Sequence, residues 1–206
     1  GPQAAEAAEA MARVFLEHGD EGPAANLRRG HDALRSTRGA AAAIAAIDAA
    51  RGTVTYGGVG NIAGCVLTGG SRRSMVSHNG TLGQQMRALG EFTYPWSHEA
   101  MLVLHSDGLV SHWSLDAYPG LAARDPSLIA GILYRDFTRG RDDVTVVVAK
   151  ACDLVARLSQ GRPTDLAQAH GDVLVAHYLD PTRRPVRGRC RARGPRSGRC
   201  PSMPSR

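Results

Sequence analysis

Two acidic motifs in this sequence place metal-binding side chains next to apolar runs. Asp107 and Gly108 follow the run M-L-V-L-H-S, and Asp142 and Asp143 directly precede V-T-V-V-V-A. Carboxylate oxygens are ligands that Mg²⁺ and Mn²⁺ prefer. If the two runs are neighbouring strands, their ends hold these carboxylates rigidly and bring them together around a hard cation. Glycine after Asp107 leaves room for the water shell of a metal ion or for a tight turn.

Each motif also has a plainer explanation. Asp-Gly is common in turns, and an Asp-Asp pair before a strand can simply be solvated. His105, within the apolar run, and His112, after it, either orient phosphate or water or are hydrogen-bonded structural groups. Ser106 and Ser111 have no His-Asp arrangement that we can locate, so a serine hydrolase is disfavoured.

The apolar pattern predicts an α+β domain that would position these motifs. Helices are expected over residues 2–18, 23–34 and 127–138. Strands are expected over residues 39–48, 53–58, 62–67, 73–77, 91–94, 100–105 and 144–149. Alanine propensity favours a helix over 39–48, but the T-V-T-Y run that follows indicates a hairpin, so we predict a strand there. The glycines after Tyr56 indicate a bulge or a close approach of two backbones.

Several of these motifs occur, in the same order, in bacterial metal-dependent protein phosphatases. They are Y-G-G-V-G-N-I-A-G (56–64), S-H-N-G-T-L-G (77–83), H-S-D-G-L-V-S-H-W (105–113) and G-R-D-D-V-T-V-V-V (140–148). Residues 1–150 thus resemble the type 2C-like (PPM) phosphatase superfamily, in its sporulation stage II protein E-like branch. The T-R-G-A-A-A-A-I stretch and the Trp after S-D-G-L are most similar to RsbX-type phosphatases of stress-signalling modules.

This resemblance implies an α-β-β-α sandwich with a two-metal Mn²⁺ or Mg²⁺ centre between its sheets. The ions would activate a water that attacks phosphoserine or phosphothreonine, and no side chain would act as the nucleophile. Asp107 and Asp142 match metal ligands, and Asp143 matches a supporting or ligating position. Residues expected near the site are Gly108, His78, Asn79, His105 and Arg141. The implied substrate is a phosphorylated regulatory protein of bacterial stress or sigma-factor signalling, such as an anti-sigma-factor antagonist.

The start of the chain departs from the family pattern. The first metal motif of the family, usually D-G-x-G-H-G, precedes the first long helix, whereas this chain begins G-P-Q-A-A-E at that helix. We therefore expect a domain that lacks its first strands and the aspartate that bridges the metals. The alternative to a phosphatase is accordingly an inactive fragment or pseudo-phosphatase that serves as a binding or regulatory module.

The charge is concentrated at the end of the chain. Residues 181–206 contain nine arginines and no acidic residue, although the net charge of the whole chain is only +6. This segment has too few apolar residues to form a core, so we predict a disordered tail. A basic tail can bind nucleic acid, but we favour a solvated tail without that role. Residues 151–180 show a weak helical pattern and are predicted to be a helical extension.

The remaining features indicate an intracellular protein. No apolar run approaches the roughly 18 residues of a membrane-spanning helix, and no signal peptide is evident. The four cysteines have neither the spacing of a zinc site nor that of a CxxC motif. We therefore expect free thiols, a cytoplasmic location and no membrane partner.

Overall fold

The computed structural model describes residues 2–86, 88–140, 143–151 and 173–179. The helices are α1 (Pro2–His18), α2 (Pro23–Ala33), the short 3-10 helix η1 (Leu121–Ala123) and α3 (Pro126–Phe137). The strands are β1 (Ala42–Asp48), β2 (Thr53–Val59), β3 (Ile62–Thr68), β4 (Ser71–Met75), β5 (Gly80–Thr81), β6 (Gln85–Met86), β7 (Phe92–Pro95), β8 (Met101–Ser106), β9 (Thr145–Ala151) and β10 (Val173–Leu179). The helices and strands predicted before residue 150 are confirmed, with small shifts of their ends.

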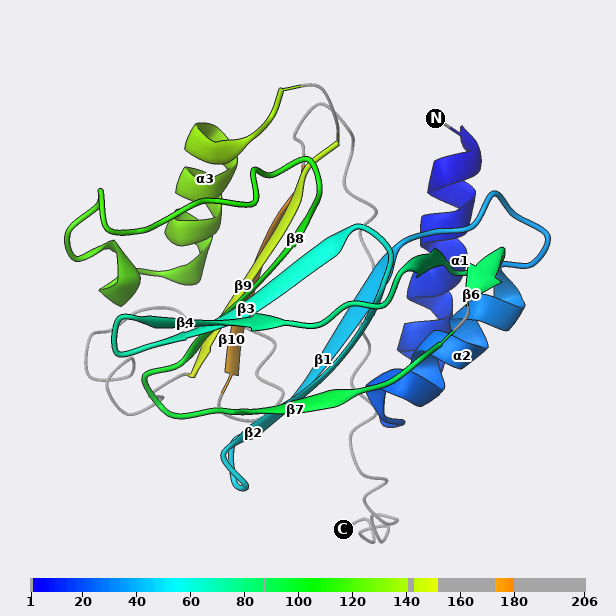
Figure 1. The fold of residues 1–206 in the computed structure, drawn as a ribbon, viewed down its shortest axis with the longest axis horizontal. Coiled ribbons are helices and arrows are strands. Elements are labelled where there is room, and N and C mark those ends of the chain that lie inside the picture. Colours follow the sequence, from blue (N-terminus) through cyan, green and yellow to red (C-terminus); the bar gives the residue numbers. More distant parts are fainter. Residues whose placement is uncertain (1, 87, 141–142, 152–172, 180–206) are drawn as a thin grey trace, which may run out of the picture.

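The strands form two main antiparallel sheets, ordered β1-β2-β7 and β10-β9-β8-β3-β4. In Figure 1 the two sheets lie face to face, with α1 and α2 on the outer side of the smaller sheet and α3 on the outer side of the larger one. The hairpin of β5 and β6 lies beside α1 and α2. The predicted α+β fold with α-β-β-α layers is therefore confirmed.

The apolar run before Asp107 is buried on both faces because it lies inside the larger sheet. This strand, β8, pairs with β3 on one side and with β9 on the other. Leu102 belongs to the core between the two sheets with Tyr56, whereas Val103 belongs to the core beneath α3 with Leu133. Successive strand residues point to opposite faces, so nearly every position of β8 needs an apolar side chain. Asp107 therefore follows a strand that is held by neighbours on all sides.

The alanine-rich segment before Asp48 forms β1, as predicted from the hairpin context. It pairs with β2 along its whole length. Asp48 Oδ1 accepts a hydrogen bond of 2.9 Å from Arg51 N and so holds the turn between the two strands. Ala43 and Ala45 pack against the core between the sheets, and Ile44 is buried on the side of α1 and α2. Tertiary pairing thus overrides the helix preference of alanine.

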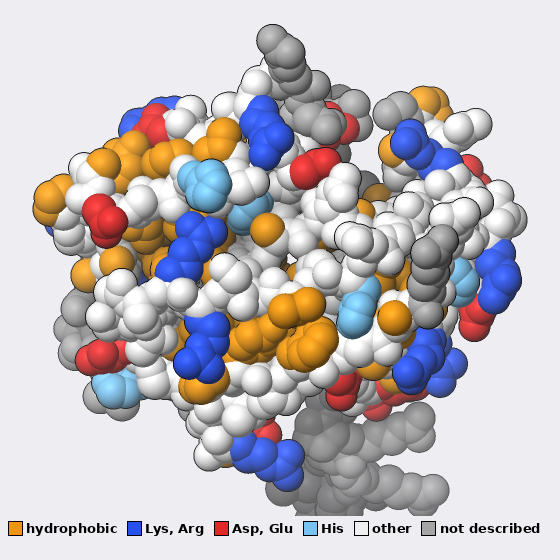
Figure 2. Space-filling view, in the orientation of Figure 1, with side chains coloured by type: hydrophobic (Ala, Val, Ile, Leu, Met, Phe, Trp, Pro, Cys, Tyr) orange, Lys and Arg blue, Asp and Glu red, His pale blue; other side chains and the backbone are white. Residues whose placement is uncertain are grey.

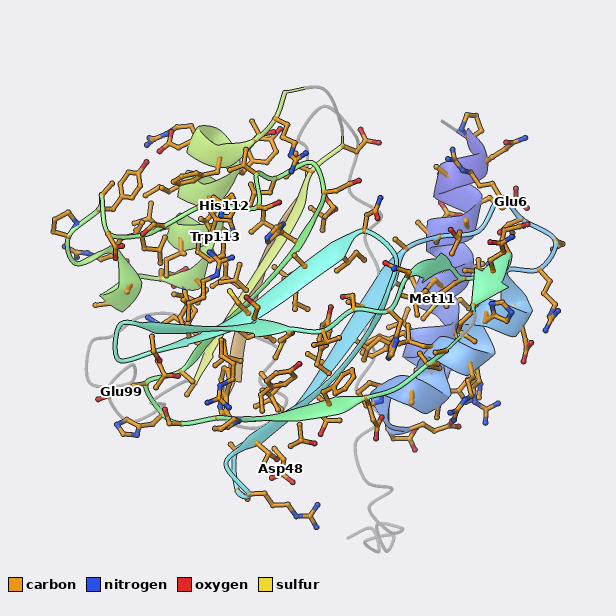
Figure 3. All side chains as sticks on the ribbon, in the orientation of Figure 1. Glu6, Met11, Asp48, Glu99, His112 and Trp113 are labelled. Atoms are coloured by element: carbon orange, nitrogen blue, oxygen red, sulfur yellow. The ribbon has the colours of Figure 1, made fainter. Side chains whose placement is uncertain are left out.

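Helices α1 and α2 form a close-packed hairpin over the smaller sheet. Met11 of α1, labelled in Figure 3, faces α2, and a Cβ atom at Gly30 would lie 2.2 Å from Met11 Sδ. The side-chain amide of Asn26 donates hydrogen bonds to His18 O at 2.8 Å and to Glu21 O at 2.9 Å. These bonds satisfy carbonyl groups at and just after the end of α1, where the helix itself offers no donor. None of the described helices is long and apolar enough to cross a membrane.

The predicted helical extension over 151–180 is wrong in its last part, because Val173–Leu179 form β10, antiparallel to β9. The sequence V-L-V-A-H-Y-L is rich in residues that favour strands, and an exposed edge of β9 would offer unpaired backbone groups. These two preferences explain why a strand forms. Through this strand, part of the extension belongs to the larger sheet. Residues 152–172 and the predicted tail, 181–206, lie outside the described residues.

Candidate metal centre

A cleft of about 500 Å³ opens where strands of the two sheets end. Ser106 and Asp107 line it at the end of β8, Asn61 lines it before β3, and Thr145 lines it at the start of β9. The other lining residues are mostly small or apolar: Ala41, Ala43, Gly60, Ile62, Gly80, Thr81, Leu104, His105 and Val147. The cleft therefore has an apolar base, and polar groups are grouped at the strand ends.

Asp107 lies at this cleft with an exposed side chain. Asn61 Nδ2 donates a hydrogen bond of 3.3 Å to Asp107 Oδ2. The two residues meet because β3 and β8 are antiparallel neighbours with Ile62 opposite Ser106. Asp107 thus presents a carboxylate whose direction is set partly by an amide from the neighbouring strand.

The backbone of the second acidic motif lies close to the residues on either side of Asp107. Ser106 Oγ donates to Asp143 O at 3.3 Å and accepts from Thr145 N at 3.0 Å. A Cβ atom at Gly108 would lie 2.5 Å from Asp143 O, so only glycine allows this close approach of the two segments. The described part of the second motif therefore lies beside the first, with the Asp143 side chain exposed. Arg141 and Asp142 lie outside the described residues.

The described donors suit a hard cation in kind. Asp107 and Asp143 supply carboxylate oxygens from adjoining segments, and Mg²⁺ is often held by one or two carboxylates while it keeps several waters. Within the described residues no group of three or more His, Cys, Asp and Glu side chains could hold a metal ion. The assignment of Asp107, Asp142 and Asp143 as ligands therefore stays a prediction.

His105 is buried beside the cleft, and both of its ring nitrogens have hydrogen-bond partners. Its Nε2 accepts a hydrogen bond of 3.2 Å from Trp113 Nε1, and its Nδ1 lies 2.9 Å from Ser106 O. An indole N–H can only donate, so the ring proton of His105 is on Nδ1, which donates to Ser106 O. Burial lowers the pKa of His105 and so favours this neutral form. These bonds support the structural role for His105 rather than a role as a phosphate-orienting cation.

The loop after β4 contributes to the cleft through residues other than the expected His78 and Asn79. The His78 ring stacks on Phe92 with centroids 5.8 Å apart, and neither His78 nor Asn79 lines the cleft. The backbone of His78 bonds to Gly58 and Gly60, at 2.8 Å and 2.9 Å. Those bonds fix the start of the loop, and Gly80 and Thr81, which follow, line the cleft instead.

Sequence reasoning did not assign Asn61, Ser106 or Thr145 to the site. A weak signal was present for Asn61, which precedes a predicted strand in the motif G-N-I-A-G. Its contact with Asp107 depends on strand order and register, which local patterns do not reveal. Ser106 acts here as a bridge between two strand ends, not as a nucleophile.

Comparison with known proteins agrees with this architecture. A family model described as stage II sporulation protein E (SpoIIE) matches residues 1–151. A solved structure from work on the bacterial stressosome, a modular system adapted to control secondary messenger signalling, is similar with a TM-score of 0.66 and 26% identity, over 72% of this chain and 78% of that one. RsbX in complex with magnesium is similar with a TM-score of 0.59 and 22% identity, over 72% of this chain and 74% of that one. Among curated proteins, none matches.

The family match and the layered fold together identify a domain of the PPM phosphatase superfamily, in its SpoIIE- and RsbX-like branch. The chain belongs to the SpoIIE family, whose match covers its described α-β-β-α layers up to the end of β9.

Proposed function

We propose that this chain is a Mn²⁺- or Mg²⁺-dependent protein serine/threonine phosphatase that acts on a phosphorylated regulatory protein in the bacterial cytoplasm. The observation that carries this proposal is that Asp107 lines an open cleft, while the Asp143 backbone lies against Ser106 and Gly108 next to it. Family membership supports the reaction class, and the cleft supplies a place for it.

The residues of the chain have distinct parts in the proposed reaction. Asp107, Asp142 and Asp143 would hold the metal, which when bound supplies an activated water and neutralises charge on the phosphoryl oxygens. Asn61 orients the Asp107 carboxylate from the side of β3. Arg141 would contact the phosphate, because a guanidinium matches phosphate oxygens in pairs.

The cleft also suits a phosphorylated side chain presented by another protein. It is open to solvent next to Asp107 and has an apolar base formed by residues such as Ala43, Leu104 and Val147. The methylene or methyl group of phosphoserine or phosphothreonine can rest on such a base while the phosphate faces the strand ends. The similarity to a stressosome-related structure and to RsbX supports a switch protein of stress or sigma-factor signalling, such as an anti-sigma-factor antagonist, as the substrate.

The test is turnover of p-nitrophenyl phosphate and of a phosphoserine peptide by the full chain, with Mn²⁺, with Mg²⁺ and with excess EDTA. We expect metal-dependent hydrolysis that EDTA abolishes and that Asp107→Asn lowers at least about a hundredfold, since a lost ligand removes the activated water. The matched control is Asp20→Asn, an exposed aspartate between α1 and α2 that does not line the cleft. Activity that persists in Asp107→Asn would show that the metal assignment is wrong.

The alternative function is a pseudo-phosphatase that uses the same fold as a binding module. Metal binding without turnover of either substrate, by a folded wild-type chain, would support this alternative over catalysis.

Nucleic-acid binding is not part of the proposal. On the face shown in Figure 2, the basic side chains of the described residues are scattered among acidic and neutral ones and form no continuous patch. A nucleic-acid surface on this face would need such a patch to follow phosphates along a strand.

A further inference from the structure

We infer that His105 and Trp113 are positioning residues, which hold the turn that presents Asp107 through one continuous chain of hydrogen bonds. This inference rests on the proposed function for the role of Asp107 as a metal ligand. The hydrogen bonds that hold the turn do not depend on that function. Neither residue is proposed as a ligand of the metal. Their part is to set the backbone from which the carboxylate projects.

The turn itself spans Ser106 to Leu109. Leu109 N donates to Ser106 O at 3.3 Å, which makes Asp107 and Gly108 the two central residues of a β-turn. Ser106 O is the carbonyl of the peptide unit that joins Ser106 to Asp107. Any group that fixes this oxygen therefore fixes the peptide plane directly before the proposed ligand.

His105 bonds to that same oxygen. A carbonyl has two lone pairs, so Ser106 O can accept from Leu109 N and from His105 Nδ1, 2.9 Å away. Nε2 of the ring accepts from Trp113 Nε1 at 3.2 Å, and this bond leaves the ring proton on Nδ1, which donates it to Ser106 O. The indole thus stabilises the tautomer of His105 that can hold the turn.

Trp113 is in turn held by two further contacts. Arg72 of β4 places its guanidinium carbon 4.2 Å from the centroid of the Trp113 ring and donates from Nη1 to Trp113 O at 2.9 Å. Trp113 is only 3% exposed and packs in the core beneath α3, where Figure 3 shows it beside the helix. The bonded chain therefore runs from β4 through Trp113 and His105 to the peptide before Asp107.

Each of these residues therefore fixes a different part of the structure around Asp107. Asn61 orients the carboxylate itself, Ser106 Oγ joins the turn to the Asp143 segment, and the His105–Trp113 pair fixes the turn backbone. Partners one step away from a metal ligand commonly change metal affinity tenfold or more when they are lost. Trp113→Phe would keep an aromatic ring in the core but would remove the N–H that donates to Nε2 of His105.

The experiment compares Trp113→Phe with Trp96→Phe in the full chain. These are the only two tryptophans, both are buried, and Trp96 Nε1 has no hydrogen-bond partner, so the control removes an indole N–H that holds nothing. Two quantities are measured: Mn²⁺ affinity, by electron paramagnetic resonance of free Mn²⁺, and amide hydrogen exchange in peptides that cover residues 101–110. Thermal melting of each variant shows that it is folded.

For Trp113→Phe we expect about tenfold weaker Mn²⁺ binding and about tenfold faster exchange at Leu109, and for Trp96→Phe neither change. His105→Asn should retain part of the wild-type Mn²⁺ affinity and exchange protection, because its side-chain amide can still donate to Ser106 O, whereas His105→Leu should retain neither. Unchanged exchange at Leu109 in folded Trp113→Phe would overturn the inference, whatever the activity. A wild-type chain without metal-dependent turnover would instead count against the proposed function, and the exchange result would still decide the role of this pair.

Discussion

Asn61 and Asp107 are joined by a hydrogen bond of 3.3 Å from Nδ2 to Oδ2, although they lie at the ends of two different strands. The bond follows from the antiparallel pairing of β3 with β8, in which Ile62 lies opposite Ser106. It gives the proposed ligand a preferred direction before any metal arrives. The Asp107 carboxylate therefore loses less conformational entropy when a metal binds.

Replacement of Asn61 tests this orientation. Asn61→Ala should raise the Kd for Mn²⁺ by about three- to tenfold, because the carboxylate loses a partner that fixes its rotamer. The full chain is titrated with Mn²⁺ by isothermal titration calorimetry. Gln3→Ala, which removes an exposed amide from α1, is the control and should leave the Kd unchanged. Equal affinities for wild type and Asn61→Ala would mean that the bond contributes nothing to binding.

The contact between the two acidic segments makes Gly108 sensitive to any side chain. In Gly108→Ala the new Cβ would lie 2.5 Å from Asp143 O and 2.8 Å from Val144 Cγ2, so the strand ends must separate. We expect a loss of about 1–3 kcal/mol in the free energy of unfolding, together with weaker metal binding. Urea denaturation measures the first quantity.

Gly131→Ala is the matched control for Gly108→Ala. Gly131 lies within α3, and a Cβ there meets nothing within 4 Å. Alanine is a better helix former than glycine, so this variant should be stabilised by about 0.5–1 kcal/mol. If both variants changed stability in the same direction, crowding at Asp143 would not be the cause.

Helix α3 should stabilise the larger sheet through a few buried side chains. Leu133 is 0% exposed and packs with Val103 and Val146 beneath the helix. Leu133→Ala should therefore cost about 2–5 kcal/mol, through lost burial and the cavity left behind. Leu128, on the same helix, is 51% exposed, and Leu128→Ala should change stability by less than about 0.5 kcal/mol. Similar losses for the two variants, in urea denaturation, would contradict the packing described here.

Asp136 should make stability depend on acid pH. Hydrogen bonds from Arg135 and then from Tyr118 Oη lower the pKa of Asp136 from 3.8 to about 2. Because the pKa is lower in the folded state, the ionised group stabilises the fold above pH 3.8, and this contribution is lost as the pH falls toward 2. Asp136→Asn should therefore lower Tm near neutral pH and approach the wild-type Tm in acid.

Circular dichroism melts at several pH values measure this difference, with Asp20→Asn as the exposed control. The site is exposed, so we expect a small effect. A difference in Tm between wild type and Asp136→Asn that stays constant from neutral pH to acid would show that ionisation of Asp136 does not cause it.

Much of the fold was predictable because its elements have strong local patterns. The β8 run is apolar at successive positions because both of its faces are covered, and β9 begins at Thr145, two residues after Asp143. Context also predicted β1 correctly against alanine propensity. The extension after residue 151 was misjudged because a strand that joins a sheet edge is defined by its partner, here β9, more than by its own periodicity.

The sequence by itself determined the family, through motifs that resemble those of the phosphatases, and this resemblance implied the order of the layers. The apolar runs placed Asp107 and Asp143 next to strands, because those runs depend on residue type and spacing along the chain. Only the tertiary structure decided that Asn61 orients Asp107. It also decided that Gly108 lies close to the backbone of Asp143, and that Trp113 donates a hydrogen bond to His105. These contacts depend on which strands become neighbours and in which register. A shift of one residue would direct the side chains of a strand to the other face, so no local pattern specifies them.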